Sequence, residues 1–202
     1  MNKKEKIKLH RDMINSIIDK ETEIAEEITQ IINDYYKEGN IDFNSLYKEI
    51  LDSIYISLKQ TYKVTLSKAK EIYPTIENED KNISNDEIDK YTYSDDNLTL
   101  AERIKKYINQ AKKEEINKNT LIFREVRILD NETLVLHHKL LKKKLKDKVE
   151  YGMVVTGGGC NKDCCNQPEE WMPIDEINEP PYHPNCTCEI IYDDNESDDE
   201  EE

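Results

Sequence analysis

The sequence predicts a mainly helical protein: a long helical hairpin and further helices, followed by a small zinc-knot-like α+β module of short strands and turns. Residues that break helices are concentrated late in the chain. Of five glycines only Gly39, and of six prolines only Pro74, precede residue 150. All five cysteines and the single tryptophan follow residue 150. Because glycine and proline mark turns, two differently built parts are expected.

A long amphipathic helix is expected from about residue 4 to about residue 37. Its apolar residues recur at spacings of three and four, which places them on one face: Ile14, Ile17, Ile24, Ile28, Ile31 and Tyr35. Gly39 suits the left-handed turn that commonly ends a helix. A second stripe runs from Tyr47 to Ile72, where Pro74 ends it. The short connection predicts an antiparallel hairpin over residues 1–74.

Residues 75–98 lose this periodicity and are rich in Asn, Asp and Glu, which predicts a polar linker with one short helix after Ser84. Helicity resumes over residues 99–150, before the Cys/His-rich knot of residues 151–192. Thr99 and Glu102 match a capping box, in which each side chain binds a backbone N–H that the helix leaves unpaired. A further helix is expected from about residue 119 to about residue 149.

That last helix ends in a lysine run comprising Lys139, Lys142, Lys143, Lys144, Lys146 and Lys148. Cations near a helix C-terminus complement the helix dipole, which is a purely structural explanation. The alternative is contact with nucleic-acid phosphates, dependent on salt and indifferent to base sequence. The preceding pair, His137 and His138, is expected to be ordinary surface or boundary residues. Neighbouring helical side chains point about 100° apart, so the two are not expected to share a metal.

The chain is acidic, with a formal net charge of −15. Residues 193–202 hold eight acidic side chains and no basic one. A block of like charge repels itself, so a disordered tail is expected, either solubilising or docking on a basic partner. No apolar run reaches the roughly 18 residues of a membrane span, and no secretory signal precedes the first helix. Neither a membrane nor a small-molecule substrate is an expected partner.

Two clusters of metal-binding residue types lie between two predicted short strands, Met153–Val155 and Glu189–Tyr192. The candidate ligands are Cys160, Cys164, Cys165, His183, Cys186 and Cys188. Thiolates and an imidazole in two turn-borne clusters are how structural zinc sites are assembled. Four of these six residues would complete a tetrahedral site. The first cluster is spaced C-x3-C or C-x4-C rather than the usual C-x2-C.

Other interpretations of these cysteines remain open. Five cysteines cannot all form disulfides, and cytoplasmic thiols stay reduced, so a metal-free turn is one alternative. A catalytic cysteine with His183 as its base is another, although it leaves the other clustered residues unexplained. A metal-dependent nuclease lacks a second histidine within the knot. A zinc-knuckle nucleic-acid-binding or regulatory protein is favoured by the lysine run and disfavoured by the acidic body.

The segment Pro180–Cys188, PPYHPNCTC, resembles the PP-x-HPNC-x-C signature of phage head morphogenesis proteins, the Mu F-like minor head family. Leu98–Ile104 resembles the family's L-S-x-R-I helix start. Arg124–Val126 lies where the family carries an Arg-Thr-Glu element, here without the threonine. The resemblance covers roughly residues 95–192.

This resemblance implies a non-enzymatic minor structural protein of a tailed-phage head, associated with the portal and acting in capsid assembly and in DNA packaging or ejection. The implied partners are the portal protein and other head proteins; any non-specific DNA contact is expected from the lysine run. The implied location is the virion, in the head interior or at the portal vertex, after assembly in the host cytoplasm. We expect the hairpin to bind the portal through a second apolar edge, formed by Ile18, Ile32, Tyr36 and Tyr55.

Overall fold

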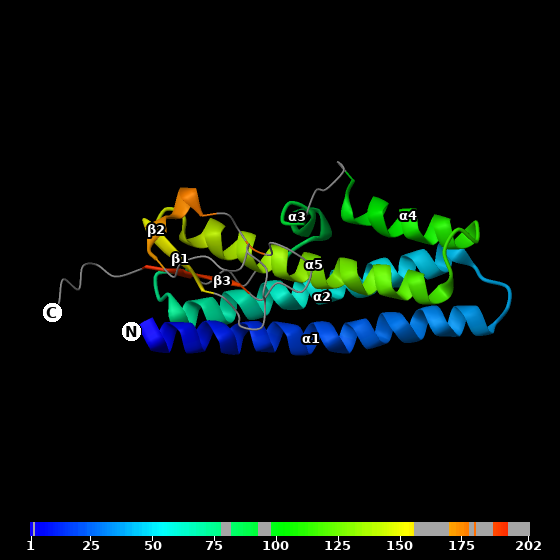
Figure 1. Cartoon of the computed structure of the whole chain (residues 1–202), viewed down its shortest axis with the longest axis horizontal. Coiled ribbons are helices and arrows are strands. Elements are labelled where there is room, and N and C mark those ends of the chain that lie inside the picture. The colour runs from blue at the N-terminus through cyan, green and yellow to red at the C-terminus, as the bar shows by residue number, and fades with distance from the viewer. Residues whose placement is uncertain are drawn as a thin grey trace.

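The computed structural model describes residues 1, 3–77, 82–92, 98–155, 170–177, 180 and 188–193. Three long helices lie along one another as a rod: α1 (Lys3–Lys37), α2 (Phe43–Ile72) and α5 (Lys118–Leu145) (Figure 1). The shorter helices α3 (Asn85–Asp89) and α4 (Leu100–Lys112) pack against this rod, α3 on α2 and α4 on both α2 and α5. The mainly helical prediction is therefore confirmed.

Helices α1 and α2 form the predicted antiparallel hairpin (Figure 1). Gly39 in the connection has a φ of +74°, a conformation that costs glycine little and other residues more. Asp42 caps α2, because its carboxylate accepts hydrogen bonds from the backbone N–H groups of Asn44 and Ser45. The β-branched stretch in the middle of α2 does not interrupt the helix.

The predicted capping box is present at α4, and a second one, which was not predicted, is present at α3. Ser84 pairs reciprocally with Glu87, and Thr99 with Glu102. Helix α5 ends at residue 145 rather than at the predicted residue 149. Residues 146–148 form a turn, in which the Lys148 N–H donates to the carbonyl oxygen of Leu145 at 2.8 Å. This turn directs the chain into the first strand, which the apolar pattern alone did not reveal.

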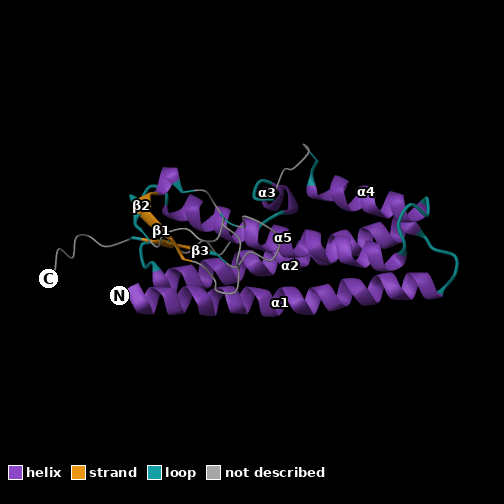
Figure 2. Cartoon of the chain, viewed as in Figure 1, coloured by secondary structure: helices purple, strands orange, loops and turns teal. Residues whose placement is uncertain are grey.

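A small antiparallel sheet closes the end of the rod at which α1 begins (Figure 2). Its strand order is β2–β1–β3, with β1 at Tyr151–Val155, β2 at Met172–Pro173 and β3 at Glu189–Tyr192. The predicted strands correspond to β1 and β3, whereas the two-residue β2 is too short to show alternation. Gly152 lies so close to the neighbouring chain that a Cβ atom there would be 2.7 Å from Ile177 Cδ1.

Helix α5 is enclosed on all sides near the sheet, since every residue from Glu132 to His138 is buried. Of the four residues expected to form an apolar docking edge on the hairpin, Ile18 and Tyr36 are partly exposed and Ile32 and Tyr55 are buried. Ile32 is 0% exposed and Tyr55 is 7% exposed, because other helices cover this face. The Tyr55 hydroxyl donates to Asp89 Oδ1 of α3 at 2.8 Å. Within the described residues, no helix is long and apolar enough to cross a membrane.

Candidate metal centre

Three histidines and one glutamate meet at the sheet end of the rod. His10 comes from α1, His137 and His138 come from α5, and Glu189 is the first residue of β3. All four are buried, with exposed fractions between 0% and 5%. His10 reaches the interior because it lies on the helix face that also buries Met13, Ile14 and Ile17.

The carboxylate of Glu189 lies at the centre of this group. Its Oε2 atom is 3.4 Å from His137 Nε2 and 3.5 Å from His10 Nδ1. One ligand atom from each of His137, His138 and Glu189 lies within 4.8 Å of the other two. These three residues could therefore hold a metal ion.

Hydroxyl groups orient two of the imidazoles. Thr65 Oγ1 is hydrogen-bonded to His137 Nδ1 at 3.0 Å, and the Tyr73 hydroxyl to His10 Nε2 at 2.7 Å. The backbone N–H of Tyr192 donates to the same Tyr73 hydroxyl at 2.9 Å. Since a hydroxyl can donate or accept, Thr65 suits His137 whether its Nε2 carries a proton or a metal.

The electrostatics of the group favour the protonation states that bind metals. Burial lowers the pKa of His138 to about 3, partly opposed by the negative charge of Glu189. Burial alone would raise the pKa of Glu189, but hydrogen bonds from His10 and His137 and the nearby histidine charges lower it to about 2. At neutral pH His138 is therefore neutral and Glu189 is ionised. Neutral imidazole and carboxylate are the forms that coordinate a cation.

Several polar atoms of the group are buried without a hydrogen bond of ordinary geometry in the described part of the chain. They include the Oε1 atom of Glu189 and the ring nitrogens of His138, one of which faces the backbone of Cys188. A buried polar atom without a partner typically costs about 1–3 kcal/mol. A cation bound by one ring nitrogen of His138 and by the Glu189 carboxylate would satisfy two of these atoms, and two imidazoles with a carboxylate form a donor set suited to zinc and related divalent ions. The residues present therefore fit a metal.

The expectation that His137 and His138 lie at the surface or its boundary is wrong. Both are buried, and their rings lie 4.9 Å apart between centroids at an interplanar angle of 68°. Their side chains leave the helix in different directions, but a third ligand from β3 lies within reach of both. The pair lies within the apolar run Leu134–Leu141, and this burial signal could have identified it.

Most of the predicted zinc-knot ligands lie outside the described residues: Cys160, Cys164, Cys165, His183 and Cys186. The sixth, Cys188, is described and is 1% exposed. It packs in an apolar cluster with Ile190 and Tyr192 and is not part of the His137–His138–Glu189 group. The knot thus stays a prediction, separate from the group described above.

Several residues of the predicted lysine run contact the chain's own polar groups. Lys139 Nζ donates to the Thr92 carbonyl oxygen at 3.0 Å, and Lys143 Nζ to the Tyr91 hydroxyl at 3.1 Å. Lys148 Nζ donates to the Thr75 carbonyl oxygen. Lys146 Nζ lies 3.9 Å from Asp175 Oδ1. These contacts tie α5 and the following turn to three other segments.

The buried group is closed to solvent, since the side chains of His137 and Glu189 are 0% and 6% exposed. Such an enclosed site can hold an ion but admits no larger molecule. In comparisons with known proteins, no family model, no curated protein and no solved structure matches this chain.

Proposed function

We propose that this chain is a minor structural protein of a tailed-phage head, associated with the portal and acting in capsid assembly and in DNA packaging or ejection. The observation that carries the proposal is the signature PPYHPNCTC at residues 180–188, in its resemblance to the minor head family. The strand that follows it, β3, packs against the helical body and places Glu189 against His10 and His137. This placement supports a structural role for the C-terminal segment.

The shape of the helical body also supports this proposal. Helix α1 has 35 residues, which corresponds to a length of about 50 Å. A stiff rod of three long helices can lie along a ring-shaped assembly. Ile56 is 50% exposed on α2, and Trp171 is 43% exposed near the sheet, so each offers an apolar contact point.

Capture by a portal protein tests the proposal. The tagged full-length chain is co-expressed with a portal protein encoded in the same phage genome, where one is found, and we expect the two to co-purify. Deleting residues 1–74 would not test binding through the hairpin, because the hairpin shares its core with α5 and its removal would unfold the rest of the chain. Ile56→Glu and Trp171→Glu instead each place a charge at an exposed position. Binding through the hairpin predicts that only Ile56→Glu weakens capture. Failure of the unmodified chain to bind the portal would contradict the proposal.

We infer that the ion suited to His137, His138 and Glu189 is zinc and that its role is structural. A catalytic zinc ion keeps an open coordination position for water or substrate, and the burial of this site leaves no room for a substrate to reach one. The ligands come from α5 and β3, so the ion would fix a four-residue strand to the rod. His10 would hold the same carboxylate from α1 through its contact with Glu189 Oε2.

Metal analysis of the full chain, purified under reducing conditions without chelator, tests this inference. Glu189→Gln and His138→Gln are expected to lose one equivalent of zinc relative to the unmodified chain. Glu125→Gln is the matched control, because it replaces another fully buried glutamate of the interior. Unchanged zinc content in Glu189→Gln would overturn the inference. If the zinc content falls in Cys186→Ser but in none of the other variants, the zinc is bound in the predicted knot.

Cobalt substitution distinguishes the two sites even if a variant folds poorly. Cobalt bound by imidazole and carboxylate shows no thiolate-to-metal charge-transfer band, whereas cobalt bound in a cysteine knot does. We expect the Cys186→Ser variant to keep cobalt absorption from the buried site. The Glu189→Gln variant should lose part of the absorption that the unmodified chain shows. A spectrum that depends only on the cysteines would contradict the buried site.

A further inference from the structure

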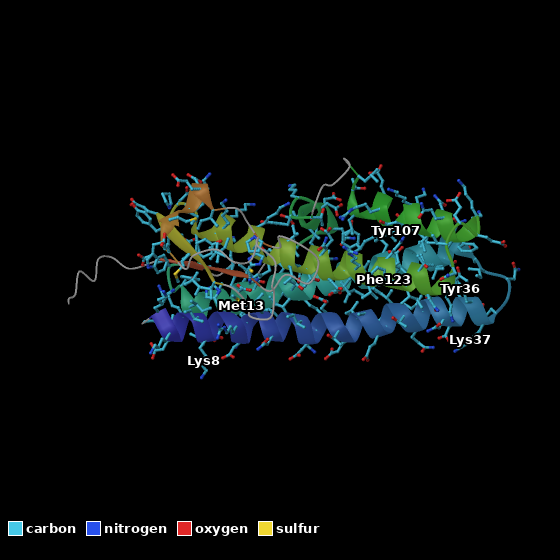
Figure 3. All side chains as sticks on the ribbon, in the orientation of Figure 1. Lys8, Met13, Tyr36, Lys37, Tyr107 and Phe123 are labelled. Carbon is cyan, nitrogen blue, oxygen red and sulfur yellow. The ribbon has the colours of Figure 1, made fainter. Side chains whose placement is uncertain are left out.

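Helix α4 lies beside α5 towards the end of the rod opposite the sheet (Figure 1), and a groove lies between the two helices. It has a volume of about 680 Å³. Its lining comes from one stripe of each helix: Leu98, Arg103, Lys106, Tyr107 and Gln110 from the α4 side, and Phe123, Arg124, Arg127, Ile128 and Asn131 from α5. Figure 3 labels Tyr107 on α4 and Phe123 on α5 beside it.

The lining is cationic in a protein that is otherwise acidic. Its four charged side chains are Arg103, Lys106, Arg124 and Arg127, and no carboxylate is among the lining residues. The whole chain, in contrast, carries a formal net charge of −15. Clustered cations on a low-dielectric wall concentrate a local positive field that attracts anions.

Arg103 lines this groove and uses only part of its hydrogen-bonding capacity. Its Nη1 atom pairs with Glu132 Oε1 at 2.6 Å, and its side chain is 14% exposed. Its Nε and Nη2 atoms are buried and have no hydrogen-bond partner within the described ranges. A guanidinium presents its donors as a fixed fork that matches two oxygens of a phosphate. Because the Nε and Nη2 atoms of Arg103 are buried, the direct phosphate contacts in the groove fall to Lys106, Arg124 and Arg127.

Aromatic rings are paired with arginines along the same groove. The guanidinium of Arg124 lies 4.7 Å from the centroid of the Tyr107 ring, and its Nη1 donates to Gln110 Oε1 at 2.5 Å. The guanidinium of Arg127 lies 5.9 Å from the centroid of the Phe123 ring. Phe123 is 61% exposed, which is unusual for a large apolar side chain. Rings and guanidinium planes are the surfaces on which unpaired bases stack.

We propose that the α4–α5 groove binds a single-stranded nucleic-acid segment, with phosphates on Lys106, Arg124 and Arg127 and bases stacked on Phe123 and on the Arg124 guanidinium that lies over Tyr107. Cations alone would suit any polyanion, but the exposed ring beside them favours a ligand with planar bases. Bases inside a duplex are already stacked and cannot use these rings. An acidic peptide would use the charges and leave the rings unused. This inference does not rest on the proposed role in a phage head.

Fluorescence anisotropy of a short labelled oligo(dT) at low salt, titrated with the full chain, tests the proposal. Lys106→Ala/Arg127→Ala removes two exposed groove cations and is expected to weaken binding at least about tenfold. It should also flatten the dependence of log affinity on log salt by about 1.4, from two lost phosphate contacts. Lys63→Ala/Lys70→Ala is the matched control, since it removes two exposed lysines from α2. Lys142→Ala/Lys144→Ala tests the lysine run in the same way, and both controls should bind normally.

Phe123→Ala separates base stacking from charge. It should weaken oligo(dT) binding about 5- to 150-fold, the range expected for one stacked base, and leave binding of inorganic polyphosphate unchanged. Circular dichroism checks that each variant keeps its helices. Equal binding by Phe123→Ala, or tighter binding of duplex DNA or of a peptide with the sequence of residues 193–202, would overturn the proposal. So would binding lost only in the lysine-run variant.

Discussion

Glu21 on α1 and Asp130 on α5 form a hydrogen-bonded pair of carboxyl groups across the rod. The pKa of Glu21 is raised to about 8. Burial is the main cause, and the hydrogen bond to Asp130 contributes in the same direction. Burial also raises the pKa of Asp130, but the hydrogen bond with Glu21 acts in the opposite direction. The shared proton therefore belongs to Glu21, and Asp130 is the acceptor.

The Glu21→Gln variant should reduce the loss of stability with rising pH. The pKa of Glu21 rises from 4.5 to about 8 on folding, so the contribution of the protonated pair is complete below pH 4.5. It is lost as the pH rises through about 8. A glutamine keeps a donor to Asp130 and does not titrate. Urea unfolding near pH 5 and near pH 8 should show a smaller decrease for Glu21→Gln than for the unmodified chain. The exposed control Glu26→Gln should behave like the latter.

Two buried glutamates on α5 should respond oppositely to the same substitution. Neither carboxylate oxygen of Glu125 has a hydrogen-bond partner in the described part of the chain, and burial raises its pKa well above the ordinary value. Glu125→Met should therefore increase the free energy of unfolding by about 1–3 kcal/mol. Glu132→Met leaves Arg103 without its ion-pair partner, so it should lower the free energy of unfolding by about 3 kcal/mol. Chemical denaturation at neutral pH measures both, and a loss in Glu125→Met would contradict this account.

Tyr73→Phe should destabilise the sheet end of the rod. The lost hydroxyl accepts from the Tyr192 N–H and binds His10 Nε2, so two buried polar atoms lose their partner. The expected decrease in the free energy of unfolding is about 2–4 kcal/mol. Tyr151→Phe is the control, because Tyr151 is 45% exposed. Equal urea midpoints for the two variants would show that the hydroxyl is unimportant.

Gly152→Ala should destabilise the sheet by overpacking. Its new Cβ would meet Ile177 Cδ1 at 2.7 Å and Ile190 Cγ2 at 3.2 Å. Overpacking of this kind typically costs about 1–3 kcal/mol. The second substitution Ile177→Val removes the closest atom, so the double variant should recover part of the melting temperature. No recovery would place the strain elsewhere.

Helix positions were predictable because their signals are local. Thr99 with Glu102, Ser84 with the short helix that follows it, Gly39 and Pro74 each act within one turn of chain. The end of α5 was misplaced because Val149, which extends the apolar pattern, is buried beyond a turn rather than on the helix. Strand β2 has two residues, too few for any period to be visible.

The histidine–glutamate group was not predictable from local pattern. His137, His138 and Glu189 come together only when β3 packs on α5, and nothing within one helix indicates which distant strand will arrive. From its sequence position alone, Glu189 is expected to be an exposed polar residue at the start of a strand. The cationic groove was missed for a similar reason, because Arg103 and Arg124 lie on separate helices and only tertiary packing makes them neighbours.

The hydrogen bond between Tyr192 and Tyr73 joins positions 119 residues apart, and its effect extends to biosynthesis. On the ribosome, α1 and α2 can pair soon after they emerge, since their contacts are local in sequence. The sheet end must wait until residue 192 has left the exit tunnel. Until then the nascent chain exposes His10, Tyr73 and the apolar residues around them, which chaperones and proteases recognise. Completion of this end therefore distinguishes a chain translated beyond residue 192 from one released before it.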